Sequence, residues 1–408
     1  MAEHAGILSS SPAPAVPEAN QMADLPDDAM LLVLSRLPLD DLIQCRLVCK
    51  RLARLALHPD AWRRRRLTNA CNSCNPCPLF SAGLRLGSCV DSMRIELPPE
   101  TGCHLLFTSP CAARRLTIST VHGGAGSWQA ALLVRHQGLL GRLREVDLTL
   151  YSPCPCDAKS AVKADVSVLL GTLASTPGLE KLTIKGDEDD PKRPMQNGVS
   201  CLHVTVPPSL THFTCRPRDS RLEPAVNALL AAHAATLEEV EIVSLKAWPP
   251  SSRMGLVLAK LLRLAKLECQ MLPDMEAVAA CESLRELTLI VDDEVSPACR
   301  ESIAAFFRRA VQLREVHFTW CHVHADCLDF VAALASSGRS RVETLGIYSV
   351  SRSPEPAELQ VLLAALRSLP ALRRLRVNAE RDSDEAKALL EALPSLDVDL
   401  GQDIHGDS

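Results

Sequence analysis

The residues whose types and spacing could do chemistry are, first of all, cysteines. Cys71, Cys74 and Cys77 form a C-x-x-C-x-x-C run, with Cys89 beyond it. Thiolates at this spacing can bind zinc. The sequence has no second C-x-x-C knuckle beyond this run, and the prolines that interrupt it are typical of a loop. We therefore predict free thiols here and no metal site.

A second cluster consists of Cys321, His322, His324 and Cys327. These side chains could also bind zinc, but Cys321 has a structural explanation in the repeat pattern described below. The glycines at 123–126 are followed by no P-loop Lys-Ser/Thr pair, and no hydrolase or kinase signature is apparent. We predict no catalytic residue, metal or cofactor. A zinc-dependent enzyme built on the cysteine clusters is one alternative, and it would require bound metal and turnover.

Length and composition favour an elongated protein that binds other proteins. The chain has 408 residues, whereas single cores stop growing at about 250–300 residues. Its net charge of −5 argues against nucleic acid as the main ligand. We find no secretory signal and no run of the ~20 apolar residues that a membrane helix needs. The seventeen cysteines then indicate a reducing compartment, cytoplasmic or nuclear, with mostly free, buried thiols.

The N-terminal part of the chain divides into a tail and a helical segment. Residues 1–22 are rich in Ser and Pro, which predicts a disordered tail. Within 23–68, Pro26 suits the first turn of a helix that Pro38 ends. Asp40 is a good N-cap for a second helix continuing to about Leu55, and a short third piece contains Trp62.

This helical segment raises a physical problem. About 40 residues in short helices cannot bury a core of their own and need a staple or a partner. Its helices are nevertheless apolar on more than one face, and an exposed apolar patch marks an interface. The segment therefore predicts a protein-docking module.

From residue 90 a six-residue motif, apolar-x-x-apolar-x-apolar, recurs along the chain. Its alternating fourth and sixth positions predict a strand, and helical runs lie between copies. One strand and one helix cannot bury their apolar sides alone, so stacking of the units builds the core. The clear copies are at 143–148, 179–184, 210–215, 237–242, 264–269, 284–289, 313–318, 342–347 and 372–377, and weaker ones are at 90–95, 113–118 and 393–398.

These segments predict the domain organisation. The expected fold class is α/β: a small all-helical module followed by a degenerate repeat solenoid with a curved parallel sheet. We expect a Cys-rich linker at 69–89, the solenoid at 90–400 and a disordered tail at 401–408.

Residues 25–66 resemble an F-box. Leu52 departs from the family, which usually has an aromatic residue there. The residues that carry the resemblance are Leu25-Pro26, Leu34, Leu37-Pro38, Asp41-Leu42, Arg46, Val48-Cys49-Lys50-Arg51 and Trp62.

Residues 90–400 resemble leucine-rich repeats. The L-x-x-L-x-L core is present, but the Asn or Cys expected three positions later is mostly missing; Cys321 occupies that position in one repeat. The whole chain thus resembles an F-box/leucine-rich-repeat protein. This resemblance implies the substrate receptor of an SCF-type, cullin-RING ubiquitin ligase, non-catalytic itself. The F-box would bind the SKP-type adaptor and the repeats would bind the protein to be ubiquitinated and degraded. The alternative is a repeat scaffold whose F-box binds nothing.

The resemblance also implies site residues. About half of the adaptor-contacting set are expected to hold the helices together instead. That set is Leu25, Pro26, Leu34, Leu37, Pro38, Leu42, Val48, Cys49, Leu52 and Trp62.

In leucine-rich repeats the third and fifth motif positions point out of the inner sheet. From Glu239 to Glu315 these positions carry five acids and one base, Lys266, and they turn basic further on. An acidic face would favour a basic segment on the bound protein; a charged but merely solvated sheet face is the other interpretation. The candidate substrate-binding residues are Glu239, Glu241, Glu268, Glu286, Glu315, Arg374 and Arg376.

Overall fold

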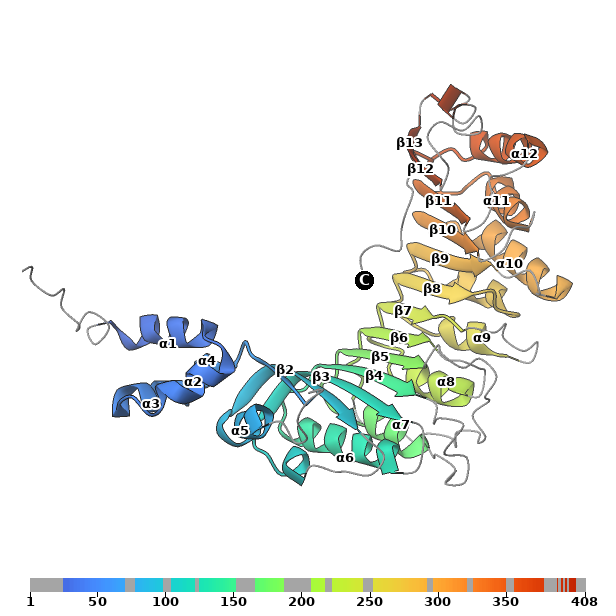
Figure 1. Ribbon diagram of the computed structural model, residues 1–408. Helices are drawn as coiled ribbons and strands as arrows, with labels where there is room; N and C mark the ends of the chain where they lie inside the picture. Colours follow the sequence, from blue (N-terminus) through green and yellow to red (C-terminus); the bar gives the residue numbers. More distant parts are fainter. Residues whose placement is uncertain are drawn as a thin grey trace, which may run out of the picture.

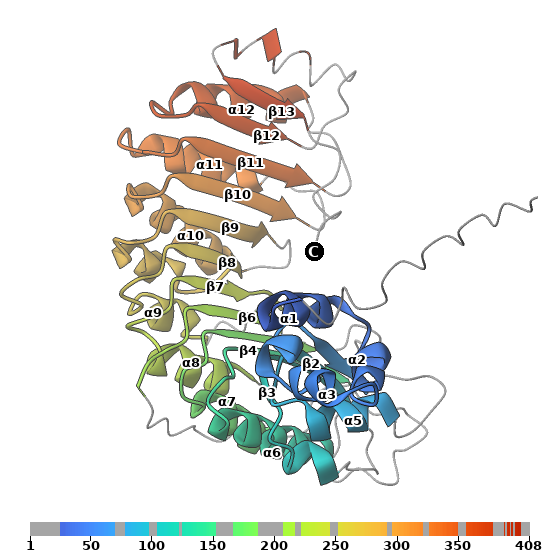
Figure 2. The same cartoon turned by 90° about the vertical axis from the view of Figure 1, so that its left-hand side faces the viewer.

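The computed structural model consists of a small helical module followed by a long curved solenoid (Figure 1). The strands line the concave side of the solenoid and the helices lie on its outer side (Figures 1 and 2). This confirms the α/β fold class. The structure describes residues 25–69, 78–97, 104–121, 125–151, 166–186, 207–216, 222–244, 252–291, 296–320, 326–349, 356–377, 387, 390–391, 393–394 and 396–400.

The N-terminal module contains four helices: α1 (Asp27–Arg36), α2 (Leu39–Cys45), α3 (Lys50–Ala56) and α4 (Pro59–Trp62). The predicted second helix is wrong in two respects. Pro38, and not Asp40, is the N-cap residue of α2. The helix also stops after Cys45, because the next residues form tight i to i−3 hydrogen bonds and Cys49 is extended and caps α3 by accepting the Leu52 N–H at 3.5 Å.

Within the described residues thirteen strands form one sheet in chain order, and every neighbouring pair is parallel. The strands are β1 (Arg66–Thr68), β2 (Cys89–Leu97), β3 (Ala112–Val121), β4 (Glu145–Tyr151), β5 (Lys181–Gly186), β6 (His212–Arg216), β7 (Glu239–Ile242), β8 (Lys266–Gln270), β9 (Glu286–Val291), β10 (Glu315–Trp320), β11 (Thr344–Ser349), β12 (Arg374–Val377) and β13 (Asp397–Leu400).

The outer layer of the solenoid is less regular than the sheet. Where the structure describes the connections, short 3₁₀ helices occur at His104–Phe107 and Met275–Ala280. The α-helices are α5 (Pro78–Leu86), α6 (Ala125–Leu139), α7 (Ser167–Ala174), α8 (Glu223–Ala232), α9 (Met254–Leu258), α10 (Pro297–Arg309), α11 (Asp326–Ser336) and α12 (Pro356–Arg367).

The repeat motif fits the core as predicted. In the nine clear copies the first, fourth and sixth side chains are all buried, and burial of such a side chain contributes about 1.5–3 kcal/mol. The weak copy at 393–398 is misplaced by two residues. Val398 pairs with Leu375 and so takes the fourth position, which the motif assigned to Leu396.

The sheet begins before the boundary that the sequence predicts. β1 lies within the segment assigned to the helical module, and it pairs with β2. The segment expected as a linker, 69–89, includes the whole of α5. Gly83 of α5 lies against Leu67, since a Cβ on Gly83 would come within 2.8 Å of its side chain. The amphipathic pattern of α5 was overlooked because cysteines and prolines precede it.

Hydroxyl side chains join neighbouring repeats at the start of the strands. The residue just before the motif donates to the carbonyl of the first motif residue in the previous repeat: Ser209 to Leu179 at 2.8 Å, Thr236 to Leu210 at 2.7 Å, and Ser283 to Leu264 at 2.9 Å. Buried carbonyl groups need such donors. Each of these three hydrogen bonds therefore connects one repeat to the next.

Buried thiols lie along the described part of the solenoid. Of the described cysteines, all free, Cys111, Cys215, Cys269, Cys281 and Cys299 are buried. The Cys71–Cys77 run and most of the 321–327 cluster lie outside the described residues. Among the residues that are described, no group of three His, Cys, Asp or Glu side chains could hold a metal ion. In the same part of the chain no helix is long and apolar enough to cross a membrane.

Candidate protein-binding surfaces

Three of the ten predicted adaptor-contacting residues lie inside the N-terminal module. Leu34, Leu42 and Trp62 are at most 1% exposed. The Trp62 indole N–H donates to the Ala56 carbonyl at 2.7 Å, and Gly87 of the first repeat lies against its ring. These side chains hold the helices together and join the module to the solenoid, so they are not available to a partner.

The other seven predicted residues remain accessible. Leu25, Leu37 and Leu52 are partly exposed, although all three pack against the core. The remaining four, Pro26, Pro38, Val48 and Cys49, are exposed. Val48 is 69% exposed and lies in the turn between α2 and α3, where a large apolar side chain has no structural need to be.

Sequence reasoning missed four exposed large apolar residues in this module, one of which is Leu57, 39% exposed. Leu47 is 81% exposed, and Leu32 and Val33 on α1 are 53% and 42% exposed. For Leu32 and Val33 the signal in the sequence was the unbroken apolar run 30–34, which places apolar side chains all round the helix. With Val48, these residues give the module a larger apolar surface than the predicted set.

Charged residues hold the first turn of α1 in place beside this surface. The Asp27 carboxylate accepts hydrogen bonds from Arg51 at 2.9 Å and from Arg54 at 3.0 Å. The hydrogen bond from Arg51, opposed by partial burial, lowers the pKa of Asp27. Arg51 also donates to the Leu25 carbonyl. The segment that precedes α1 is thereby anchored to α3.

The concave face of the sheet carries two continuous rows of side chains, because the strand register aligns equivalent motif positions. Each third-position residue pairs with the third-position residue of the next strand, and each fifth with the next fifth. We call these the third-position row and the fifth-position row. From β7 to β12 they are Glu239, Lys266, Glu286, Glu315, Thr344, Arg374 and Glu241, Glu268, Thr288, His317, Gly346, Arg376.

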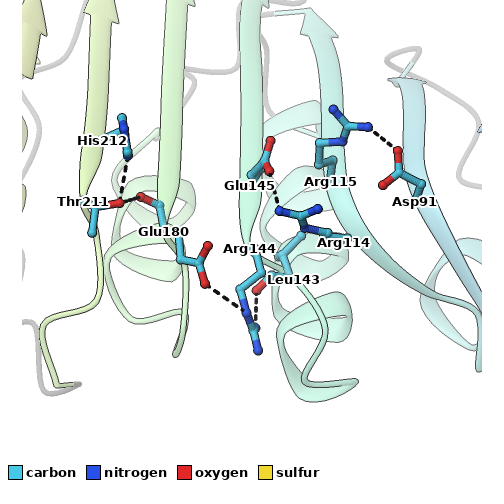
Figure 3. Close-up of polar contacts among 9 residues, drawn as sticks. All are labelled: Asp91, Arg114, Arg115, Leu143, Arg144, Glu145, Glu180, Thr211 and His212. Atoms are coloured by element: carbon cyan, nitrogen blue, oxygen red, sulfur yellow. Dashed lines mark hydrogen bonds and ion pairs between the residues drawn. The ribbon is translucent and has the colours of Figure 1, made fainter. Parts of the chain in front are cut away.

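Toward the N-terminal end of the solenoid the charges of the sheet pair with one another (Figure 3). Arg115 binds Asp91, Arg114 lies 3.5 Å from Glu145, and Arg144 lies 3.4 Å from Glu180 in the adjacent repeat. Such exposed pairs are each worth about 1 kcal/mol or less. They leave little net charge for a ligand in this part of the sheet.

The middle of the concave face has an excess of carboxylates. Glu241 forms an ion pair with Arg216 at 2.6 Å, and Glu286 forms one with Lys266 at 3.8 Å. The carboxylate of Glu239 lies 3.5 Å from the ring of His212. No ion pair or hydrogen bond within the described residues involves the Glu268 carboxylate. Burial, followed by the negative charge of Glu241, raises the pKa of Glu268.

The basic end predicted from Arg374 and Arg376 lies beside two acids of the neighbouring strand. Arg374 donates to Asp397 of β13 at 2.9 Å, and Arg376 is in register with Asp399. Sequence reasoning missed these acids because it misplaced the last motif by two residues. The five predicted glutamates thus lie together in the middle of the face, whereas Arg374 pairs with Asp397 and Arg376 lies beside Tyr348.

Beside the carboxylates lies an aromatic pair that the sequence did not reveal. The His317 and Tyr348 rings stack with centroids 5.9 Å apart and planes at 21°. They lie over Gly346, where an added Cβ would come within 2.2 Å of His317 Nδ1 and 2.8 Å of the Tyr348 ring. Only glycine leaves room for both rings, so this site is specific to β10 and β11.

Comparison with known families identifies the helical module, whereas comparison with solved structures does not inform on the solenoid. The F-box-like family model matches residues 22–68. A search of curated proteins finds no match. A crystal structure of a Bacteroides fragilis protein is 14% identical, with a TM-score of 0.33 over 72% of this chain and 67% of that chain, a likeness too low to inform fold or function. The match at residues 22–68 identifies the N-terminal module as an F-box-like domain.

Proposed function

We propose that this protein is the substrate-recognition subunit of an SCF-type ubiquitin ligase. The observation that carries the proposal is the F-box-like match at residues 22–68, joined to a solenoid with an open concave sheet. The F-box-like domain binds the SKP-type adaptor, and through it the cullin-RING ligase. The solenoid binds the protein to be ubiquitinated, and the chain itself does no chemistry.

The adaptor interface is centred on exposed apolar side chains of the F-box-like domain. Leu47 and Val48 are the most exposed of these, and large apolar anchors that fill pockets on a partner dominate interface energetics. The accessible members of the predicted set, Leu25, Pro26, Leu37, Pro38, Cys49 and Leu52, extend this surface.

The fold supports a substrate site on the concave face. The F-box-like domain extends from the N-terminal end of the solenoid toward the side on which the concave face opens (Figures 1 and 2). A protein held against the sheet would thus lie on the same side of the molecule as the adaptor. Its contacts include the glutamates of β7 to β10, which favour a basic segment through charge complementarity.

The test replaces Leu47 and Val48 together by Asp in the full chain, followed by capture of purified SKP-type adaptor and cullin. We expect capture to fall at least tenfold. The matched control is Leu262→Asp, because Leu262 is 74% exposed on the solenoid and lies outside the F-box-like domain. Leu34 is unsuitable, because a charge at this buried position would unfold the module.

The same experiment separates the ligase receptor from a scaffold. A scaffold reading expects neither adaptor nor cullin to bind the unaltered chain, whereas the receptor reading requires both. Capture that is equal for the double variant, the control and the unaltered chain would refute the assigned interface.

A further inference from the structure

We propose that the fifth-position row of β7 to β11 binds an extended peptide segment of the partner protein through two side chains: a Lys or Arg over Glu241 and Glu268, and an aromatic or large apolar residue, four positions away, on the rings of His317 and Tyr348. This deepens the proposed function, on which it rests, by naming the chemistry of the segment that the solenoid recognises.

The cationic half of the segment is argued from the carboxylates. Glu241 and Glu268 are direct register partners on β7 and β8, so their carboxylates stand side by side. Arg216 pairs with Glu241 at 2.6 Å, while within the described residues no ion pair or hydrogen bond holds Glu268. Arg216 and Lys266 act on Glu268 only through their charge. A Lys or Arg side chain of the ligand would therefore supply a direct partner, and a charge-assisted hydrogen bond at a half-buried site is strong.

The aromatic half is argued from the ring pair. The His317 and Tyr348 rings stack beside Gly346, and the His317 side chain keeps 16% of its surface exposed. Apart from His317, the fifth-position row carries charged or short side chains. Glu315 lies 3.6 Å from His317 Nε2, and burial lowers the pKa of His317. The neutral ring does not repel a nearby cation. An aromatic residue of the ligand that packs on these rings gains stabilisation beyond that from burying its surface.

The spacing follows from sheet geometry. Neighbouring strands lie about 4.8 Å apart, so the two to three strand steps from Glu268 to the ring pair span roughly 10–14 Å. An extended chain rises about 3.3 Å per residue, and every second side chain faces the same way. Residues i and i+4 therefore face the sheet about 13 Å apart. Residue i+2 is too near, and i+3 points away.

The probe is a set of fluorescently labelled twelve-residue peptides of Ser, Gly and Ala. Each contains one Lys and one Phe, separated by two, three, four or six positions. Binding to the full-length protein is followed by fluorescence anisotropy at low salt. We expect the four-residue spacing to bind at least fivefold more tightly than the others, and replacement of either Lys or Phe by Ser to remove the preference.

Two variants localise the binding. Glu268→Gln should weaken the four-residue peptide at least fivefold without changing the peptide that lacks Lys, and Gly346→Ala, which displaces the rings, should remove the contribution of Phe. Glu180→Gln is the matched control, since Glu180 is an ion-paired carboxylate in an earlier repeat. Melting curves of all variants identify any loss caused by unfolding.

The outcomes distinguish this site from the proposed function. Equal binding of all spacings, or binding unchanged by Glu268→Gln and Gly346→Ala in folded protein, overturns the site even if adaptor is captured. Spacing-dependent binding by a chain that captures no adaptor leaves the site standing and overturns the ligase assignment.

Discussion

The guanidinium of Arg65 donates to the Leu34 carbonyl at the C-terminal end of α1, with a nitrogen–oxygen distance of 2.6 Å. Arg65 also donates to the Leu37 carbonyl at 2.7 Å and to Ala61 at 2.8 Å. Its own carbonyl accepts the N–H groups of Asp91 and Ser92 at the start of the sheet. One buried residue therefore ties the F-box-like domain to the first repeat.

Replacement of Arg65 by Ala should destabilise this junction. Carbonyls at a helix end then lose their donors, and unsatisfied buried groups cost about 1–3 kcal/mol each. We expect the free energy of unfolding to fall by about 3 kcal/mol, measured by urea denaturation. Arg64→Ala is the matched control, because Arg64 is exposed. Equal stability of the two variants would mean that the junction is held by apolar packing alone.

The hydrogen bonds that Ser and Thr hydroxyls donate from one repeat to the previous one lead to a second prediction. Thr236→Val keeps the side-chain shape but removes the donor to Leu210, 2.7 Å away, so unfolding should become easier by about 1 kcal/mol. Thr236→Ser keeps the hydroxyl and should retain most of the stability. The comparison of Val with Ser in urea denaturation isolates the hydrogen bond; a Val variant as stable as the Ser variant would show that this hydrogen bond contributes nothing.

His233 should make stability depend on pH. The ring is 3% exposed, its Nδ1 accepts the Ser209 N–H at 3.2 Å, and burial lowers its pKa below 6.5. As pH falls below 6.5 the unfolded chain takes up a proton before the folded chain does, so stability is lost below that pH.

The comparison variant is His233→Asn, whose amide oxygen can accept the same N–H groups without titrating. Melting temperatures between pH 7.5 and 5 should fall more steeply for the unaltered protein than for this variant. Parallel curves would assign the pH dependence to other groups.

Thiol reactivity should separate the exposed Cys49 from the cysteines in the core. Cys215 and Cys269 occupy sixth motif positions and are fully buried, and burial raises the pKa of Cys215 to about 12. Cys49 is exposed at the start of α3. A maleimide at pH 7.5 should therefore modify Cys49 in the native protein and the other two only after unfolding. Peptide mass spectrometry reads each site, and native labelling of Cys269 would contradict the core assignment.

The repeats were predictable from the sequence because the apolar positions of the motif are the positions whose side chains are buried. Alternation at the fourth and sixth positions placed β2 to β12 correctly, since each strand must bury the same side. The last strand was misplaced because 393–400 contains two apolar sets of similar quality, and only pairing of Val398 with Leu375 decides between them.

The binding surfaces were less predictable, because motif matching does not distinguish a residue that faces a partner from one that faces the core. Leu34 and Leu47 look equally apolar in sequence, yet one is 1% exposed and the other 81%. The His317–Tyr348 pair joins different strands and depends on Gly346 between them, a relationship that no local pattern contains.

Glu268→Gln should stabilise the fold while it weakens ligand binding. Burial raises the pKa of Glu268, so above its usual value of about 4.3 the unfolded chain is ionised more readily than the folded one, and stability falls as pH rises. At pH 7 a neutral Gln removes this penalty. We expect a higher melting temperature for the variant at pH 7 and a smaller difference at pH 4. A structural carboxylate would give the reverse result, because its loss would lower the melting temperature; residues retained for binding commonly cost stability.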